Sequence, residues 1–217
     1  MAHNIVHTVP KGADQMPIAP QDLSAMVAAR ICHDLVSPLG AIGNGLALIV
    51  ASQQMQGPEI DLVVQSTECA NAKLRFFRVA FGIVSAEQMI SQAEINSILR
   101  AMEAHQKQRI RWTGATELTR RQVKLVFLLL MCLETALPWG GDIDVMIHAG
   151  GVQLIARAER MKIDDALWAS LGSGSVLEDV TSARVQFLLA GIELRAQGAR
   201  LGLLEHAGSL SLDLALH

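Results

Sequence analysis

A histidine stands beside an acid near the start of the chain, in the stretch ICHDLVSPLGAIGNG at residues 31–45. An imidazole titrates near neutral pH, so a solvated His33 offers a neutral ring nitrogen, which is a good nucleophile. Asp34 can orient the ring or stabilise positive charge on it, as acids do beside catalytic histidines. The pair therefore predicts nucleophilic chemistry, with His33 as the attacking group.

The residues that follow this pair weaken helices, although the surrounding apolar pattern is helical. An interior glycine costs a helix about 1 kcal/mol relative to alanine, and an interior proline costs about 3 kcal/mol. We expect the missing side chains to clear a surface on which another protein's helix or loop can lie close. The residues that share this surface with His33, at one- and two-turn spacing, are Arg30, Ser37, Gly40, Ala41 and Asn44. Gly43 is expected on the inner side, where two helices approach each other.

Three other interpretations of this stretch compete with a docking surface. A phosphate-cradling loop needs a G-x-G-x-x-G or G-x-x-x-x-G-K-[ST] pattern after a strand, and GAIGNG fits neither. A membrane-spanning helix needs about 20 apolar residues, whereas the apolar part here covers only residues 39–51. The third interpretation, an ordinary surface histidine on a helix, remains open.

Two long helices are predicted around the histidine. Apolar residues at alternating steps of three and four mark one seam over residues 21–54 and another over residues 59–84, and Gly57-Pro58 marks the turn between them. One antiparallel hairpin cannot bury both seams, so we expect a homodimer in which two hairpins form a four-helix bundle. The seams consist of Cys32, Leu35, Leu39, Ile42, Leu46 and Ile49 in the first helix, and of Ile60, Val63, Thr67, Ala70, Leu74, Phe77, Phe81 and Val84 in the second.

The pattern after residue 85 predicts an α+β domain, with a sheet that helices cover on one face. Helices are expected over residues 91–106, with Ser91 as N-cap, and over 119–137 and 181–197. The expected strands are residues 109–112, 142–148, 152–157, 199–205 and 209–214, with turns at 149–151 and 207–208. The predicted organisation is a flexible segment at 1–20, the helical hairpin at 21–85 and the α+β domain at 86–217.

The composition limits the partners and the location. Of the 217 residues 51% are hydrophobic and 18% are charged, as in globular proteins, and the net charge of −3 leaves no basic excess for a nucleic acid. The first twenty residues lack the apolar core of a secretory signal, and the most apolar run, residues 123–133, is too short to span a bilayer. Cys32, Cys69 and Cys132 are widely spaced, which predicts reduced, buried thiols and no metal site. A cytoplasmic protein without membrane contact is expected.

The stretch HDLVSPL, residues 33–39, resembles the phosphoacceptor motif H-[ED]-[LI]-x-x-P-L of sensor histidine kinases. The hairpin around it resembles their dimerisation and histidine phosphotransfer domain. The α+β part is similar in length and element order to their ATP-binding (Bergerat) domain. In those kinases two asparagines of a buried helix hold Mg²⁺-ATP, and the resemblance puts Met131 and Thr135 at their positions.

Two further nucleotide motifs are missing, so the resemblance is to a degenerate ATP-binding domain. The D-x-G-x-G box is replaced by AERMKIDD at residues 158–165, and the glycine-rich lid by a segment with an isolated GSG. Met131 cannot bind Mg²⁺ as an oxygen ligand would. We therefore expect no ATP-dependent autophosphorylation and no cofactor bound by this chain.

A chain that has the histidine motif and lacks the nucleotide motifs is similar to the ChpT-type histidine phosphotransferases of the alphaproteobacterial cell-cycle phosphorelay. The resemblance implies that His33 accepts a phosphoryl group from the receiver domain of a CckA-like hybrid histidine kinase. It implies onward transfer to the receiver aspartates of CtrA-like and CpdR-like response regulators, with Mg²⁺ supplied by the receiver. Asp34 would hold the ring in the donor tautomer, and Ser37 would contact the receiver.

Basic residues of the second helix are a further candidate for receiver docking. Arg75 and Arg78, with Lys73, are expected to form a cluster that either binds an acidic receiver or is simply a solvated face. Two alternatives remain for the chain as a whole. One is an ATP-using sensor-type histidine kinase core with an unusual nucleotide site, and the other is a non-catalytic dimeric scaffold in which His33 has no chemical role.

Overall fold

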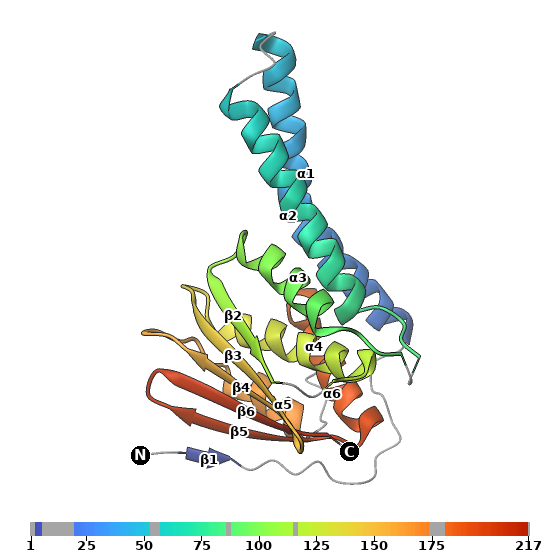
Figure 1. The fold of residues 1–217 in the computed structure, drawn as a ribbon, viewed down its shortest axis with the longest axis vertical. Coiled ribbons are helices and arrows are strands. Elements are labelled where there is room, and N and C mark those ends of the chain that lie inside the picture. The colour runs from blue at the N-terminus through green and yellow to red at the C-terminus, as the bar shows by residue number, and fades with distance from the viewer. Residues whose placement is uncertain are drawn as a thin grey trace.

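A long helical hairpin stands on a body made of a twisted sheet and several helices (Figure 1). The computed structural model describes residues 3–5, 20–52, 57–85, 88–114, 117–173 and 181–216. The predicted architecture, an N-terminal helical hairpin followed by an α+β domain, is confirmed.

The hairpin consists of α1 (Pro20–Ser52) and α2 (Pro58–Ala80), which contact each other extensively. Pro58 occupies the first turn of α2, where the missing N–H leaves no helical hydrogen bond unmade. The predicted bounds of the first helix are correct to within two residues. The second helix ends at Ala80, so Val84, which was assigned to its seam, lies outside it.

The two helices are in close contact at Gly45 rather than at the predicted Gly43. A Cβ atom on Gly45 would lie 2.6 Å from Cγ2 of Val63 and 3.3 Å from the carbonyl oxygen of Glu59. Gly43 is exposed, and a Cβ atom there would meet nothing within 4 Å. The prediction for Gly43 is wrong because two positions on a helix differ by about 200° around its axis, which places Gly45 against α2 and turns Gly43 away from it.

Gly45→Ala is expected to lower the free energy of unfolding by about 1–3 kcal/mol, because the new methyl group overlaps Val63. Gly40→Ala is the matched control: with no atom within 4 Å of its Cβ position, it gains only the helix propensity of alanine, about 1 kcal/mol. Urea titration of both variants measures the difference. Equal midpoints would contradict a close approach at Gly45.

The body is built on a six-stranded sheet with the strand order β1-β5-β6-β4-β3-β2. The strands are β1 (His3–Ile5), β2 (Gln108–Thr113), β3 (Gly141–His148), β4 (Gly151–Arg157), β5 (Arg200–His206) and β6 (Ser209–Ala215). β2 and β3 pair in parallel, and the other neighbours are antiparallel. The predicted hairpins β3–β4 and β5–β6 are confirmed. Residues 1–20 were predicted to be flexible, but β1 within them pairs with β5.

Helices cover one face of the sheet, as predicted (Figure 1). They are α3 (Gln92–Glu103), α4 (Arg120–Ala136), α5 (Asp165–Ser173) and α6 (Val185–Gln197), with a 3-10 turn, η1 (Ser182–Arg184), directly before α6. The predicted N-cap Ser91 accepts a hydrogen bond from the backbone N–H of Glu94 (3.1 Å). The nine-residue helix α5 has no counterpart in the sequence prediction.

The hairpin and the body share one hydrophobic core at the lower end of α2. α4 is buried along most of its length and contacts both α2 and α6. The ring of Phe76 in α2 is 1% exposed and stacks on that of Phe127 in α4, with their centroids 4.7 Å apart. Val79 and Ala80 are completely buried in the same cluster. The base of α2 is therefore fixed to the body by apolar packing.

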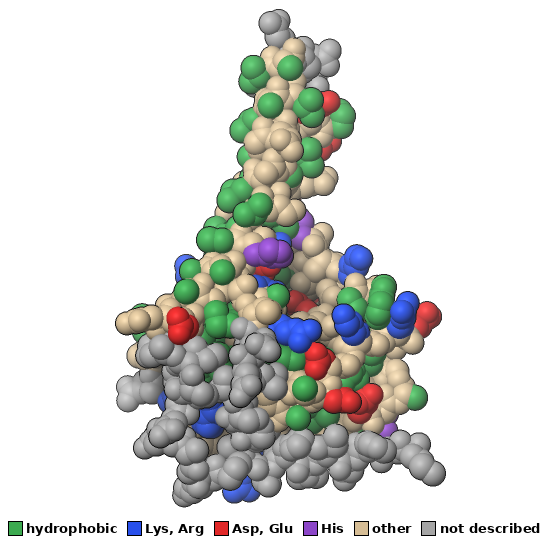
Figure 2. Space-filling view, turned by 180° about the vertical axis from the view of Figure 1, so that it is seen from behind, with side chains coloured by type: hydrophobic (Ala, Val, Ile, Leu, Met, Phe, Trp, Pro, Cys, Tyr) green, Lys and Arg blue, Asp and Glu red, His purple; other side chains and the backbone are tan. Residues whose placement is uncertain are grey.

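The upper hairpin, in contrast, exposes a row of apolar side chains, and Figure 2 shows such groups along the stem. Of the predicted seam in α1, Leu35, Ile42 and Ile49 are half-buried, whereas Leu39 and Leu46 are 56% and 50% exposed. The exposed row, at alternating steps of four and three, is Cys32, Val36, Leu39, Gly43, Leu46 and Val50. We call these six residues the α1 stripe.

The α1 stripe corrects one cysteine prediction. Cys132 is buried as predicted and Cys69 is half-buried, but Cys32 is exposed. The prediction of a buried thiol is wrong for Cys32 in the single chain, because the residue lies in the exposed row.

The apolar character of α1 also bears on the membrane question. By length and composition the segment Gln21–Ala51 could cross a membrane. From the sequence only residues 39–51 were counted as apolar, and this property was therefore not predicted. Such a helix is weak evidence of a span, and α1 carries an ion pair between Arg30 and Asp34. Burying these charges in lipid would be costly.

Candidate phosphoacceptor site

His33 lies on α1 and projects into solvent, with its side chain 84% exposed. Its Nδ1 atom is 3.1 Å from Oδ1 of Asp34. An ionised carboxylate can only accept hydrogen bonds, so this contact assigns the proton to Nδ1. Nε2 is then the unprotonated nitrogen, and its lone pair is available to an incoming electrophile. The two side chains are in contact, as their adjacency in the sequence predicts, and the chemical role of each stays a prediction.

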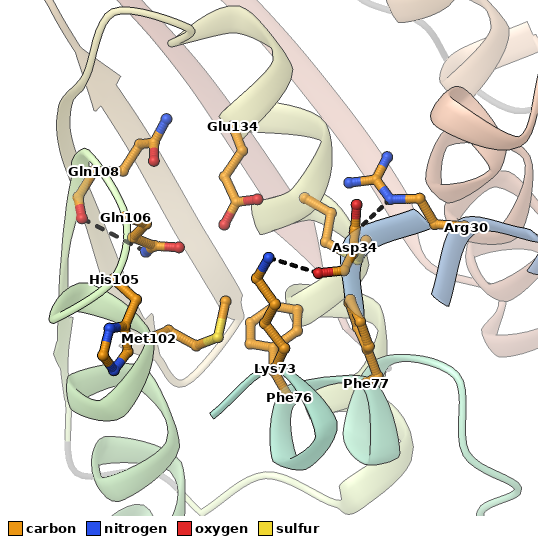
Figure 3. A pocket seen from close by; sticks show the side chains of 11 residues that line it. Arg30, Asp34, Lys73, Phe76, Phe77, Met102, His105, Gln106, Gln108 and Glu134 are labelled. Atoms are coloured by element: carbon orange, nitrogen blue, oxygen red, sulfur yellow. Dashed lines mark hydrogen bonds and ion pairs between the residues drawn. The ribbon is translucent and has the colours of Figure 1, made fainter. Parts of the chain in front are cut away.

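Asp34 is itself held by two cations (Figure 3). Nε of Arg30 donates to Oδ2 of Asp34 at 2.7 Å, and Nζ of Lys73 donates to its backbone carbonyl oxygen at 2.8 Å. The two carboxylate oxygens therefore have different partners, His33 on one and Arg30 on the other. Charge-assisted bonds of this kind are the stronger ones in proteins. The bond from Arg30 restricts the rotation of the carboxylate and, through it, that of the imidazole ring.

The surface beside His33 is open at the positions predicted from the glycines. Ser37, Gly40 and Asn44 are exposed, and a Cβ atom on Gly40 would meet nothing within 4 Å. Ala41 is half-buried. The cleared surface is therefore present above the histidine on α1.

Arg30 was predicted to belong to this docking surface, but the structure gives it another position. Its side chain is only 18% exposed. Besides Asp34, its Nη1 atom donates to the carbonyl oxygen of Ala183 at 2.6 Å and lies 3.5 Å from Oε1 of Gln186. The sequence shows that Arg30 is one turn before His33, but not that η1 and α6 of the second domain come to lie beside it. The docking assignment of Arg30 is corrected for this reason.

The basic residues Lys73, Arg75 and Arg78 of α2, predicted to form one cluster, lie on two different sides of the helix. Lys73 points to the backbone of α1 at Asp34. Arg75 and Arg78 are exposed elsewhere on α2, where Nη2 of Arg75 donates to Oγ of Ser97 in α3 (3.0 Å). Residues 73 and 75 point in different directions because they are about 200° apart on the helix. Arg75 and Arg78 thus remain the basic pair that a partner could contact.

A cavity of about 230 Å³ lies behind the Arg30–Asp34 pair, between the hairpin and the body (Figure 3). It is lined by polar and charged groups from both parts and by Phe76, Phe77, Met102 and Met131. Its polar lining is Arg30, Asp34, Lys73, His105, Gln106, Gln108 and Glu134. A polar cavity between the hairpin and the body, which we call the junction, therefore lies directly behind the site of His33.

Glu134 is the residue of this junction that sequence reasoning missed as a functional group. Its Oε1 atom is inaccessible to solvent and has no hydrogen-bond partner among the described residues. Burial raises the pKa of Glu134 from 4.5 to about 7, while the positive charges of Arg30 and Lys73 oppose the rise. The available signal in the sequence was an acid directly after the apolar run of residues 123–133.

Stability is expected to fall as the pH rises from about 4.5 to 7, because the folded protein retains the proton of Glu134 that the unfolded chain releases in this range. Glu134→Gln removes this loss. The variant should exceed the wild type by about 2–3 kcal/mol in unfolding free energy at pH 8 and show little difference at pH 4.5. Chemical denaturation at both values measures the effect, and a difference independent of pH would contradict it.

Met131 and Thr135, which the resemblance puts at the positions of the kinase asparagines, both lie on α4. Met131 is 2% exposed and lines the cavity, and Oγ1 of Thr135 donates to the carbonyl oxygen of Cys132 at 2.7 Å. In the described part of the chain, no three His, Cys, Asp or Glu side chains gather as they would around a metal ion.

The fold and site define an α+β protein with an exposed, acid-paired histidine on a helical hairpin. The family model for the histidine phosphotransferase C-terminal domain matches residues 92–208. The chain belongs to this histidine phosphotransferase family. The matched region runs from the start of α3 to the turn after β5, so it covers most of the body and not the helix that carries His33.

The chain is also similar to individual proteins. It is 35% identical over 132 residues to the protein phosphotransferase ChpT of Brucella abortus (strain 2308), over 58% of this chain and 61% of the relative. The match thus spans less than two thirds of that protein. A solved structure of a bacterial phosphotransferase has a TM-score of 0.78 and 24% identity, and the match covers 92% of this chain and 98% of that one. This second likeness shows the fold.

Proposed function

We propose that this protein is the histidine intermediate of a phosphorelay. Nε2 of His33 takes a phosphoryl group from a phospho-aspartate of one receiver domain and passes it to the aspartate of another. The observation that carries the proposal is the contact of Nδ1 with Asp34 at 3.1 Å on a side chain that is 84% exposed. A nucleophile with a fixed tautomer and free access from solvent suits transfer between proteins, and a buried active site does not.

The transfer forms one bond and breaks one bond. The lone pair of Nε2 forms the N–P bond, the acyl-phosphate O–P bond breaks, and its electron pair leaves on the receiver's carboxylate. The proton stays on Nδ1, where Asp34 stabilises the positive charge that the ring gains. Mg²⁺ bound by the receiver neutralises charge on the phosphoryl oxygens. In the second transfer the aspartate of another receiver attacks phosphorus, and Nε2 is the leaving group.

The proposed partners are those that the resemblance to ChpT-type phosphotransferases implies. The donor is the receiver domain of a CckA-like hybrid histidine kinase, and the acceptors are CtrA-like and CpdR-like response regulators, all in the cytoplasm. The cleared surface at Ser37, Gly40 and Asn44 lets a receiver helix lie beside His33. Arg75 and Arg78 would contact acidic groups on the receiver.

The protein is further proposed to act as a homodimer through the hairpin. The α1 stripe repeats at steps of four and three, as in the seam of a helical bundle, and its apolar side chains are 50–77% exposed. A second hairpin would cover them in a four-helix bundle. Light scattering at micromolar concentration should give twice the mass of 23.4 kDa, and Leu46→Glu should give the single mass. A monomeric wild type would refute the dimer.

The function is tested with a phosphorylated receiver domain purified away from its kinase. Incubated with this protein, the receiver should lose its label, and the label should appear here as a base-stable, acid-labile adduct. Labelled ATP and Mg²⁺ alone should give no adduct, whereas an ATP-using kinase would become labelled. A non-catalytic scaffold would stay unlabelled in both reactions, and either of these results would refute the proposal.

A further inference from the structure

We propose that Arg30 is a positioning residue through which the second domain orients the His33–Asp34 pair. The inference deepens the proposed function and rests on it for its kinetic arm. It gives the body of the protein a part in the transfer that does not involve a nucleotide.

The contacts of Arg30 connect three segments that are distant in the sequence. Nε donates to Oδ2 of Asp34 at 2.7 Å, and Nη1 donates to the carbonyl oxygen of Ala183 at 2.6 Å, in η1. A guanidinium group is planar and rigid, so two bonds from different nitrogens fix its orientation. Asp34 in turn accepts from Nδ1 of His33 on its other oxygen. The chain of contacts thus runs from η1 through Arg30 and Asp34 to the imidazole ring.

Gln186 supports the same connection from the first turn of α6. It is completely buried, and its Nε2 atom has no hydrogen-bond partner among the described residues. Its Oε1 atom is 3.5 Å from Nη1 of Arg30. A buried amide with an unpaired donor is unfavourable in itself. Its carbonyl oxygen, which faces the guanidinium group, gives a physical reason for a polar residue at this position.

The arrangement predicts a specific kind of defect when it is broken. Asp34 would lose the bond that holds Oδ2 and would be free to rotate away from the ring. The ring would then populate both tautomers, and the one with the proton on Nε2 has no lone pair on that nitrogen to attack phosphorus. The docking surface at Ser37, Gly40 and Asn44 would be unchanged. Transfer within the docked complex should slow, and affinity for the receiver should stay the same.

Two substitutions separate the effect of the two hydrogen bonds of Arg30, to Asp34 and to Ala183, from the effect of its positive charge. Arg30→Met removes both, and Arg30→Lys keeps the charge beside Asp34 but replaces the rigid fork by a single ammonium group. We expect both variants to lower the rate constant at saturating phosphorylated receiver about tenfold, the effect of one lost hydrogen bond to a charged group. The half-saturating receiver concentration should not change. Arg121→Met is the matched control, because Nη2 of Arg121 donates to the carbonyl oxygen of Ala196 (2.8 Å) away from His33.

Two kinetic outcomes would overturn the proposal. A raised half-saturating concentration with an unchanged rate constant would make Arg30 a docking residue. An Arg30→Lys variant equal to the wild type would show that its charge alone is sufficient.

An NMR experiment tests the same proposal without any phosphoryl transfer. In the unphosphorylated protein, ¹⁵N chemical shifts of the His33 ring should report a proton on Nδ1. Arg30→Met and Gln186→Met should shift these signals towards a mixture of tautomers, and Arg121→Met should not. Unchanged shifts in both variants would overturn the proposal. A wild type that accepts no label but shows the expected shifts would refute the relay function and leave the positioning role intact.

Discussion

His33→Gln is expected to abolish phosphoryl acceptance from a phosphorylated receiver and to leave the fold unchanged. Glutamine is of similar size and polar, but its amide nitrogen has no lone pair that can attack phosphorus. Because the imidazole is 84% exposed, its removal should change the unfolding free energy by less than about 0.5 kcal/mol. The loss of transfer should therefore be complete, without a change in stability or in oligomeric state.

The matched control for this experiment is His206→Gln, which replaces an exposed histidine at the end of β5. It should transfer at the wild-type rate. The label remaining on the receiver, measured over time, gives both rates in one assay. Residual transfer by the His33 variant above the receiver's own hydrolysis would show that another group accepts the phosphoryl group.

Phe76→Ala is expected to have the largest effect on stability, about 3–5 kcal/mol. The ring is 1% exposed and stacks on Phe127 at 4.7 Å, at the point where α2 joins the body. Its removal leaves a cavity in the core that the hairpin and the body share. Since Phe76 also lines the junction behind Asp34, the variant should loosen the site in addition to lowering the unfolding midpoint.

Ile83→Ala is the control for this prediction, because Ile83 is fully exposed just after α2 (103% relative accessibility). It should change the unfolding free energy by less than about 0.5 kcal/mol. Urea denaturation followed by circular dichroism compares the two variants. Similar midpoints would mean that the base of α2 is not packed against α4 as described.

The elements of this fold could be predicted where a local pattern specifies them. The steps of three and four place α1 and most of α2, and the glycine-containing turns place two β-hairpins. Ser91, one of the local signals, caps its helix as the capping pattern predicts. α5 (Asp165–Ser173) and β1 (His3–Ile5) were not predicted, because a nine-residue helix and a three-residue edge strand are too short for a clear period.

Only the part of the site that lies on the single helix α1 could be predicted from the sequence. The spacing puts Asp34 beside His33 and clears the surface near Gly40, and the structure agrees. The spacing does not show what approaches the helix from the rest of the chain. Ala183 lies 153 positions from Arg30 in the sequence. The contact between them, which distinguishes Arg30 from the other predicted docking residues, therefore depends on the tertiary fold and could not be predicted from local spacing.

The position of the acquired phosphorus on His33 is the most direct test of the account. The protein would be labelled with ¹⁵N at histidine, phosphorylated by a receiver domain and examined by ³¹P and ¹⁵N NMR. Because Asp34 holds the proton on Nδ1, we predict a phosphoryl group bonded to Nε2 of His33. Phosphorus on Nδ1, on another residue or on no residue of this chain would contradict it.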